Sequence, residues 1–477
     1  MIQMSNYWSN SRNLCPGYTA SSMTRREMLT YASSGFGMLA LSSLMAEDSY
    51  AGLSASTGPH FAPKAKNIIF CYMPGGASHI DTFDPKPKLA EFDGENQTPD
   101  GRRKWKKSPW QFQQHGESGI PISDLFPHIA TCADELAIVR SMKTGFPLHP
   151  RGNILMHTGR SAGGSPSLGS WINYGLGSEN KNLPGYVLLH GNTIPPGGLE
   201  SYSNGFLPAS HQAMPVRDEG IPIENIVPSD KNPRVQRAKL DVLLSQDRSF
   251  LASLGSNDSV ESAIYNYELA YRMQSLVPDV LNLDRESEAT KKLYGLDTTD
   301  KAKYNYSLQC LRARRLVEAG VRFVEINCPD LYGRMNGSWD QHWNLKEGHE
   351  NNSFMTDQGV AALIKDLRSR GMLENTLVFW GTEFGRTPHT GNVHGRDHHE
   401  TAFSVWVAGA GIKGGTVYGS TDEMGMHAIE NITTVHDLHA TILHLFGLDH
   451  ERLTYRFGGR DVSLTDVHGH VIHEILS

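Results

Sequence analysis

Short, largely apolar runs recur along the chain, and segments with helical periodicity lie between several of them. The runs span residues 67–72, 136–140, 186–189, 321–326, 377–380 and 403–408. Helix-period segments span 304–319, 356–370 and 434–446. A strand that is apolar throughout is typical of a sheet covered on both faces. The pattern therefore predicts an α/β fold with a mostly parallel sheet and helices on both of its faces.

Residues 233–300 differ from this pattern, because helical patterns follow one another there without strands between them. These patterns lie at 234–244, 259–274 and 287–293. We interpret this stretch as a helical insertion packed on one side. The prediction for residues 52–477 is one α/β domain that carries the insertion at about 233–300.

The first 51 residues have the features of an export signal. Arg25 and Arg26 precede a Gly- and Ser-rich apolar stretch at 31–45, and Ser-Tyr-Ala at 49–51 places small residues at −3 and −1 of a cleavage site. The alternative is a buried amphipathic helix, but the stretch has no polar face. It is also shorter than the roughly 20 residues of a stable membrane span. We predict twin-arginine export to the periplasm or beyond, with the twin-arginine machinery as partner and no permanent membrane span.

The numbers of charged residues, histidines and cysteines limit the classes of function that the chain can have. The chain has 44 Lys and Arg against 51 Asp and Glu, a formal charge of −7. Without a basic excess to neutralise phosphates, a nucleic-acid partner is not expected. The 22 histidines are the unusual figure, because imidazole is the commonest metal ligand in proteins. The mature chain's four cysteines lack Cys-x-x-Cys spacing, which excludes a zinc knuckle and leaves room for one or two disulfides.

Carboxylates and imidazoles gather where predicted strands end. One group follows the run at 67–72, one lies beyond 321–326, one is at the tip of 377–380, and the densest histidine cluster precedes 403–408. Ligands of parallel sheets bind beyond the carboxyl ends of the strands, so these groups predict a site for Zn, Mn, Mg or Ca. Hydrogen-bonded packing of the loops and a metal-free acid/base site are the alternatives. The six candidate ligands are Asp81, Asp340, His342, Glu383, His398 and His399.

Several segments, taken together and in order, resemble one bacterial family. They are GGASHIDTFDPKP at 75–87, HPRGNILMHTGR at 149–160, SPSLGSWINYGLG at 165–177, LPGYV at 183–187, WGTEFGRTP at 380–388, GRDHH at 395–399 and AGAGIKGGTVYGSTDEMG at 408–425. They are similar to the twin-arginine-exported family called domain of unknown function 1501. That family is similar in turn to the alkaline phosphatase and sulfatase superfamily. The resemblance implies a metal-dependent, alkaline phosphatase-like α/β fold that hydrolyses phosphate and sulfate esters.

The resemblance also implies roles for individual residues. TEFG at 382–385 resembles the superfamily's Thr-x-Asp-His-Gly step, with Glu383 in the acidic place and Phe384 where a histidine ligand would stand. Phenylalanine cannot bind a metal, so one of the two usual metal positions lacks this ligand. The other matches follow the superfamily's ligand order: Asp340 and His342 for the preceding Asp and His, His398 or its rival His399 for the last His, and Asp81 for the carboxylate after the first strand.

The catalytic group differs most from the superfamily. His149 stands where the sulfatase segment Cys-x-Pro-x-Arg has the cysteine that becomes formylglycine, so we predict that the chain is not a formylglycine sulfatase. His149 could be a nucleophile, a general acid or a structural remnant. At the start of a predicted helix its pKa should be lowered. The planar donor forks of Arg151, Arg386 and Arg396 could hold an anionic group, and the alternative for each arginine is that it is only an ion-pair partner.

Two functions follow from these observations. The first is an exported metal-dependent hydrolase that acts on a phosphate or sulfate ester of a small molecule or a polysaccharide. The second is a catalytically silent protein on the same fold that binds metal, glycans or a surface protein. The missing cysteine and Phe384 motivate the second hypothesis.

Overall fold

The computed structural model describes residues 58–477, apart from 192, 218–222, 224–225, 229–231, 255–256, 331–337 and 391–393. The predicted export signal therefore lies outside the described residues. Residues 56–477 belong to one compact unit. Among the described helices, none is both long enough and apolar enough to cross a bilayer.

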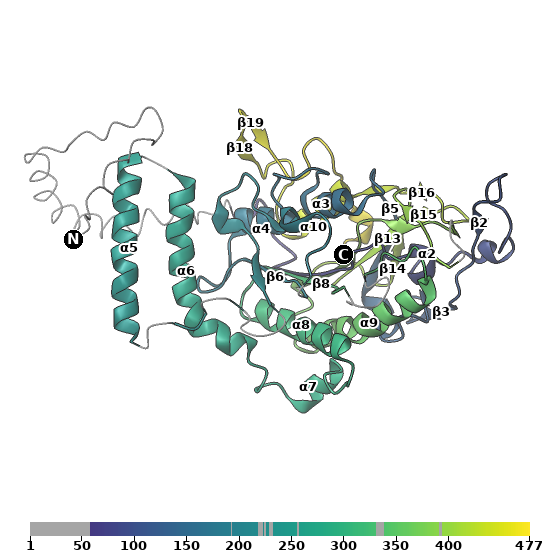
Figure 1. Cartoon of the computed structure of the whole chain (residues 1–477), viewed down its shortest axis with the longest axis horizontal. Coiled ribbons are helices and arrows are strands. Elements are labelled where there is room, and N and C mark those ends of the chain that lie inside the picture. The colour runs from purple at the N-terminus through teal and green to yellow at the C-terminus, as the bar shows by residue number, and fades with distance from the viewer. Residues whose placement is uncertain are drawn as a thin grey trace, which may run out of the picture. The chain divides into compact units, whose positions relative to one another are not determined.

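A nine-stranded sheet forms the centre of this unit (Figure 1). Its strand order is β14-β5-β13-β9-β1-β8-β6-β7, and β17 also pairs with β5. All neighbours pair in parallel except β13, which is antiparallel to both β5 and β9. The strands are β1 (Asn67–Tyr72), β5 (Leu136–Lys143), β6 (Tyr186–Leu189), β7 (Met214–Val216), β8 (Phe323–Asn327), β9 (Thr376–Gly381), β13 (Phe403–Ala408), β14 (Thr416–Tyr418) and β17 (Thr433–Thr434).

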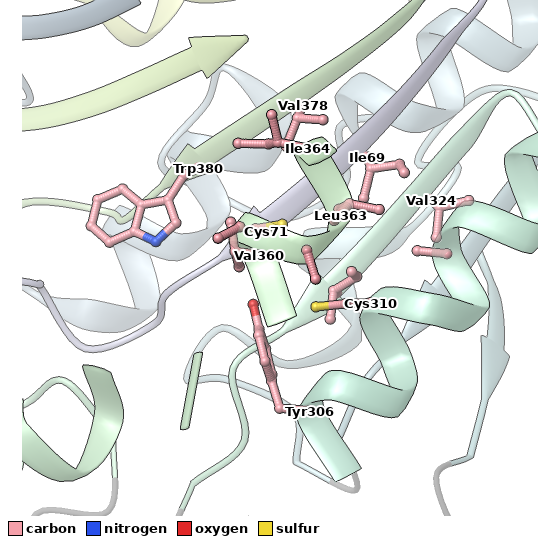
Figure 2. Packing of buried hydrophobic residues seen from close by; sticks show 14 of the residues in the cluster. Ile69, Cys71, Tyr306, Cys310, Val324, Val360, Leu363, Ile364, Val378 and Trp380 are labelled. Carbon is pink, nitrogen blue, oxygen red and sulfur yellow. The ribbon is translucent and has the colours of Figure 1, made fainter. Parts of the chain in front are cut away.

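Helices cover both faces of the sheet, as predicted. Alternate residues of β1 point to opposite faces. Ile69 and Cys71 pack in one buried cluster with α8 (Lys301–Glu318) and α9 (Leu345–Ser369). Figure 2 shows this packing, with side chains of α9 against those of β1 and β9. Ile68 and Phe70 pack in a second cluster with the helices of the other face: α3 (His149–Thr158), α4 (Leu168–Leu176) and α10 (Val435–Leu445).

Burial explains why these elements form where the sequence predicts them. Every residue of β1, β9 and β13 is buried, so each apolar side chain contributes about 1.5–3 kcal/mol to stability on either face. Cys71, Cys132, Cys310 and Cys328 are buried free thiols, so among the described residues none forms the disulfides left open by the sequence.

The predicted insertion consists of helices. They are α5 (Pro233–Leu254), α6 (Asp258–Leu281) and α7 (Glu288–Leu293). Asn257 caps α6, since its side chain accepts hydrogen bonds from the backbone N–H groups of Ser259 and Val260. Helix α6 packs against α8 and α5 packs against α6, which attaches the insertion beside the sheet.

Short elements complete the described chain and form its loops. They are α2 (His79–Thr82), β2 (Lys104–Trp105), β3 (Phe112–His115), β4 (Ile120–Ser123), β10 (Gly385–Arg386), β11 (His389–Thr390), β12 (His398–His399), β15 (Ser420–Thr421), β16 (Ala428–Glu430), β18 (Tyr455–Phe457) and β19 (Arg460–Val462). Strand β10 pairs with β12, and β2 pairs with β11. These pairings connect the loops after β9 to one another and to the segment after β1 that contains β2.

Candidate metal centre

One edge of the sheet collects the candidate residues. Strands β5, β8 and β9 point the same way, so their carboxyl ends meet at this edge, and His149, Asp340 and Glu383 follow them in the chain. Strand β13 runs the other way, so its amino end lies at the same edge, and His398 lies just before it in β12. Strand direction thus brings together residues that are up to 249 positions apart in the sequence.

Three imidazoles surround one carboxylate oxygen. Asp340 Oδ1 lies 3.2 Å from His149 Nε2, 3.2 Å from His342 Nε2 and 3.1 Å from His398 Nε2. The Nε2 atoms of His342 and His398 are 2.9 Å apart. Ligand atoms of His149, Asp340 and His398 all lie within 4.8 Å of one another. We call these four residues, His149, Asp340, His342 and His398, the Asp340 cluster.

Each imidazole of the Asp340 cluster is held by an acceptor on its far nitrogen. His149 Nδ1 is 2.5 Å from Glu383 Oε1, His342 Nδ1 is 3.3 Å from Asp397 Oδ1, and His398 Nδ1 is 2.7 Å from the carbonyl oxygen of Pro147. An acceptor at Nδ1 fixes the N–H there and leaves the lone pair on Nε2, which is how proteins orient histidine ligands. The Nε2 atoms of His149 and His398 are therefore prepared, with Asp340, for a shared cation, and His342 lies beside them.

A buried nitrogen without a hydrogen-bond partner provides a second test of whether these residues fit a metal ion. His149 Nε2 is buried and has no hydrogen-bond partner among the described residues, although Asp340 Oδ1 is 3.2 Å away. A buried polar atom without a partner is costly, and a cation would satisfy it. The two imidazole nitrogens and one carboxylate oxygen of His149, His398 and Asp340 suit Zn or Mn better than Mg or Ca, which prefer oxygen ligands. The residues present fit a divalent cation.

Electrostatics at the Asp340 cluster favour protonated His149 and His342 when no cation is bound. Burial lowers the pKa of His149, but its contacts with Asp340 and Glu383 outweigh burial and raise the pKa to about 9. The prediction that the helix terminus lowers this pKa is therefore wrong, because the two carboxylates dominate. Asp340 and then Asp397 raise the pKa of His342 to about 9. A cation would have to displace these protons, so its binding must weaken in acid.

Glu383 stands behind the Asp340 cluster and is not placed as a ligand. It is fully buried, and its oxygens accept from the backbone N–H of Gly75 at 2.8 and 3.1 Å, from the hydroxyl of Tyr72 at 3.2 Å and from that of Thr382 at 3.1 Å. Together with His149 these donors occupy the carboxylate. The structure thus corrects the expected role of Glu383 from ligand to support for His149.

Asp81 and His399 are also not brought into the Asp340 cluster. The Asp81 carboxylate pairs with the Arg396 guanidinium at 2.7 and 3.1 Å and accepts from Ser78 Oγ at 2.5 Å. His399 Nε2 lies 2.6 Å from the carbonyl oxygen of Met426. Both predicted ligands therefore have other partners. Asp81 supplies the counter-charge that the buried Arg396 needs, and His399 points to the opposite side of β12 from His398.

The two buried arginines fix loops instead of facing solvent. Arg386 Nε donates to the carbonyl oxygen of Gly76 at 2.9 Å, and Nη2 pairs with Asp340 Oδ1 at 2.6 Å. Arg396 donates to Asp81 and, at 3.1 Å, to the carbonyl oxygen of Thr387. Both side chains are fully buried, so the predicted contact of Arg386 and Arg396 with a substrate anion is corrected to a positioning role. Arg151 is exposed.

Sequence reasoning missed three supports of the site. Asp397 orients His342, and the ring of Phe384 lies 4.8 Å from the rings of both His149 and His398, where it forms an apolar wall. On α3, His157 Nε2 lies 2.8 Å from Oε1 of the buried Glu325 in β8. A glutamate inside the apolar run 321–326 was the available signal for that pair, since a buried carboxylate needs a partner.

No curated protein matches this chain. Among solved structures, it is similar to the PsFucS1 sulfatase from Pseudoalteromonas sp., with 13% identity, 81% of this chain and 68% of that chain covered, and a TM-score of 0.35. It is also similar to the phosphonate monoester hydrolase SpPMH from Silicibacter pomeroyi, with 11% identity, 74% of this chain and 71% of that chain covered, and a TM-score of 0.35. A third similar structure is a mutant of the TAB5 alkaline phosphatase, with 10% identity, 75% of this chain and 95% of that chain covered, and a TM-score of 0.33. Likeness at this level does not transfer an activity.

Family membership rests on a different comparison. The model of a family described as "Protein of unknown function (DUF1501)" matches residues 65–476, which is most of the chain and all of its sheet. The match includes every residue of the Asp340 cluster. The chain belongs to the DUF1501 family.

Proposed function

We propose that the chain binds one divalent metal ion through the Asp340 cluster and hydrolyses phosphate or sulfate esters with it. The observation that carries the proposal is the convergence of three Nε2 atoms on Asp340 Oδ1, each imidazole being held at Nδ1. A bound cation would polarise the ester and lower the pKa of a water molecule. The side chain of Asp340 is 35% exposed, so an ester from solvent can reach this cluster.

The surrounding residues then have distinct tasks. Glu383 holds His149, and Arg386 holds Asp340, so both ligands are fixed before substrate arrives. His149 Nδ1 is held by Glu383 and Nε2 would bind the cation, so His149 would keep no nitrogen free to attack an ester. Arg151, exposed on the first turn of α3 two residues after His149, would contact the anionic group of an ester on a small molecule or a polysaccharide.

The proposed place of action is outside the cytoplasm. The twin arginines and the small residues at 49–51 support export by the twin-arginine machinery to the periplasm. That machinery moves folded proteins, so a metal site built from distant segments could be loaded before export.

A silent metal-binding or glycan-binding protein is the second candidate. Phe384 favours this candidate. Its ring lies against His149 and His398 and cannot bind a metal, so it contributes no ligand to a two-metal site. The two candidates share the metal and differ in turnover.

Metal content and ester hydrolysis, measured together, test the proposal. We expect purified protein to contain about one divalent ion per chain and to hydrolyse aryl phosphates or aryl sulfates. His398→Ala should lose both properties. The matched control is His399→Ala, which removes the neighbouring imidazole outside the cluster and should keep both. Metal without turnover across a broad ester panel would favour the silent protein, and full metal in His398→Ala would reject the site.

A further inference from the structure

Two exposed apolar side chains adjoin the Asp340 cluster, and metal binding does not require either of them. Trp343 directly follows His342 and is 54% exposed. Leu148 directly precedes His149 and is 57% exposed. We call Leu148 and Trp343 the apolar rim. Single apolar side chains are common on protein surfaces, but both of these lie next to residues of the proposed metal site.

Trp343 differs from the other tryptophans of the described chain. Five of those are buried and Trp105 is half-buried, whereas Trp343 leaves more than half of its surface in water. The indole ring is among the largest apolar groups that a protein can bury, so an exposed one forgoes stabilisation. A ligand that covers the ring recovers it. Exposure of this ring beside a polar cluster therefore indicates contact with a ligand.

The backbone on both sides of Trp343 is held in place. Gln341 and Leu345 are buried, and the backbone N–H of Leu345 donates to the carbonyl oxygen of His394 at 3.0 Å. The centre of the Trp343 ring lies 5.9 Å from that of the His342 ring. A surface that is formed in advance loses little conformational entropy when a ligand binds. Trp343 thus presents its ring beside the cluster before any ligand arrives.

Leu148 belongs to a different segment from Trp343. It follows β5, whereas Trp343 follows β8. The segment of Leu148 is also attached to the cluster, because the carbonyl oxygen of Pro147 lies 2.7 Å from His398 Nδ1. Asp340, at the centre of the cluster, has a side chain that is 35% exposed. Two separate segments therefore place apolar side chains next to a polar centre that solvent can reach.

We propose that the alcohol part of the ester substrate is a ring with an apolar face, either a sugar or an aryl group, and that this ring packs on Trp343 beside Leu148. The inference rests on the proposed function, since the anionic group of the ester must lie at the Asp340 cluster. An acyclic alcohol presents no flat face to an indole and gains less from the same contact. Trp343 then determines which alcohol is accepted, while the cluster holds the anionic group.

Esters of phenol, glucose and ethanol, each as the phosphate and as the sulfate, test the preference for a ring. The metal-loaded protein is titrated by calorimetry, and KM is measured for any ester that it hydrolyses. Within each series the anionic group is the same, so a difference reports the alcohol. We expect the phenyl ester, the glucose ester or both to bind about tenfold more tightly than the ethyl ester. Comparison of phenyl with glucose esters identifies the ring, and equal binding of the ethyl ester would overturn the proposal.

Variants assign the preference to Trp343. Trp343→Ala should weaken binding of the ring ester about tenfold and raise its KM with little change in kcat, because the contact is common to substrate and transition state. Trp343→Phe retains a ring and should retain most of the preference. The control Phe354→Ala removes an aromatic side chain of the same 54% exposure from α9, and it should bind as the unmodified protein does. An undiminished preference in Trp343→Ala would overturn the assignment.

Metal content separates this inference from the proposed function. The three variants should hold as much metal as the unmodified protein, because none of them removes a residue of the Asp340 cluster. Metal with ester binding but without a preference for a ring would overturn this inference alone. Ring esters that bind without turnover would support it on a silent protein. An unmodified protein that holds no metal would overturn the proposed function and, with it, this inference.

Discussion

At the scale of single residues, Glu383 distinguishes support from ligation. Its oxygens accept from four donors, of which His149 is one. In Glu383→Gln the amide nitrogen cannot accept, so His149 should be held less firmly. We expect metal affinity to fall about 10–100-fold while saturating metal still fills the site. Competition with a metal-binding dye measures this. If Glu383→Gln cannot be loaded at any concentration, the carboxylate is a ligand after all.

Arg151 provides a second test at this scale. Of the three arginines predicted to hold a substrate anion, Arg386 and Arg396 are fully buried, and Arg151 is exposed beside His149. Arg151→Gln should raise KM for an anionic ester about tenfold with little change in kcat, because it removes binding common to substrate and transition state. The control Arg160→Gln changes an arginine just beyond the far end of the same helix. Equal effects of both variants would exclude a specific contact.

Residue types and spacing predicted much of the cluster but not which neighbour enters it. Asp340, His342 and His398 were expected beyond strand ends and do meet there. His398 and His399 alternate across β12, so one faces the site and the other faces Met426. The sequence does not determine which side faces inward. Asp81 could not be separated from the ligands either, since its partner Arg396 lies 315 residues away.

At the scale of elements, the Glu325–His157 pair attaches α3 to β8 beneath the cluster. Both side chains are almost fully buried, and Tyr186 donates to Glu325 Oε2 at 2.9 Å. Breaking a buried pair leaves an uncompensated charge, so Glu325→Gln should lower the free energy of unfolding by about 3–5 kcal/mol. Glu318→Gln changes a half-exposed carboxylate whose partner Arg314 keeps Glu286 and Asp366, so it should cost less than about 1 kcal/mol. Urea denaturation measures both, and equal losses would contradict the expectation.

The same pair makes stability depend on pH. Burial lowers the pKa of His157, but the charge of Glu325 outweighs this and raises the pKa above its ordinary 6.5. The stabilisation is therefore complete below pH 6.5 and is lost as the pH rises through the folded-state pKa. The unfolding free energy of Glu325→Gln should show a smaller decline across that range. If the unfolding free energies of Glu325→Gln and of the unmodified protein change with pH in parallel, His157 is not the source of the pH dependence.

Strand positions could be predicted from the sequence better than strand directions. Six apolar runs correspond to β1, β5, β6, β8, β9 and β13. An apolar run is buried on both faces whichever way it points, so its composition does not reveal that β13 is antiparallel. The connection between β9 and β13 does carry a signal. A parallel pair needs a long crossover, usually a helix, and the described residues between 382 and 402 contain no helix. The short strands β7, β14 and β17 have too few residues for a pattern.

At the scale of the whole molecule, export is the first prediction. Arg25 and Arg26 precede the apolar stretch, and a twin-arginine signal depends on both guanidinium groups. Replacing both by lysine keeps the charge and should leave the precursor in the cytoplasm. Cell fractionation followed by immunoblotting measures this, with the unmodified chain as control. Normal processing of the lysine variant would contradict twin-arginine export.

Metal binding should also stabilise the whole unit, because the proposed ligands come from three separate segments. His149 begins α3, Asp340 and His342 follow β8, and His398 lies in β12, so one ion would connect loops on both sides of β1. A ligand at 100 times its dissociation constant stabilises the folded state by about 2.7 kcal/mol. Removing metal with a chelator should therefore lower Tm by a few degrees, and adding the cation back should restore it.

Two variants show whether that shift belongs to the Asp340 cluster. Asp340→Asn keeps the size of the side chain but removes the anionic charge on which three imidazoles and Arg386 converge. Its Tm should be the same with and without chelator. His399→Ala leaves all four cluster residues in place and should keep the full response. A chelator shift that persists in Asp340→Asn would place the stabilising ion elsewhere, while a shift lost in His399→Ala would return His399 to the ligand set.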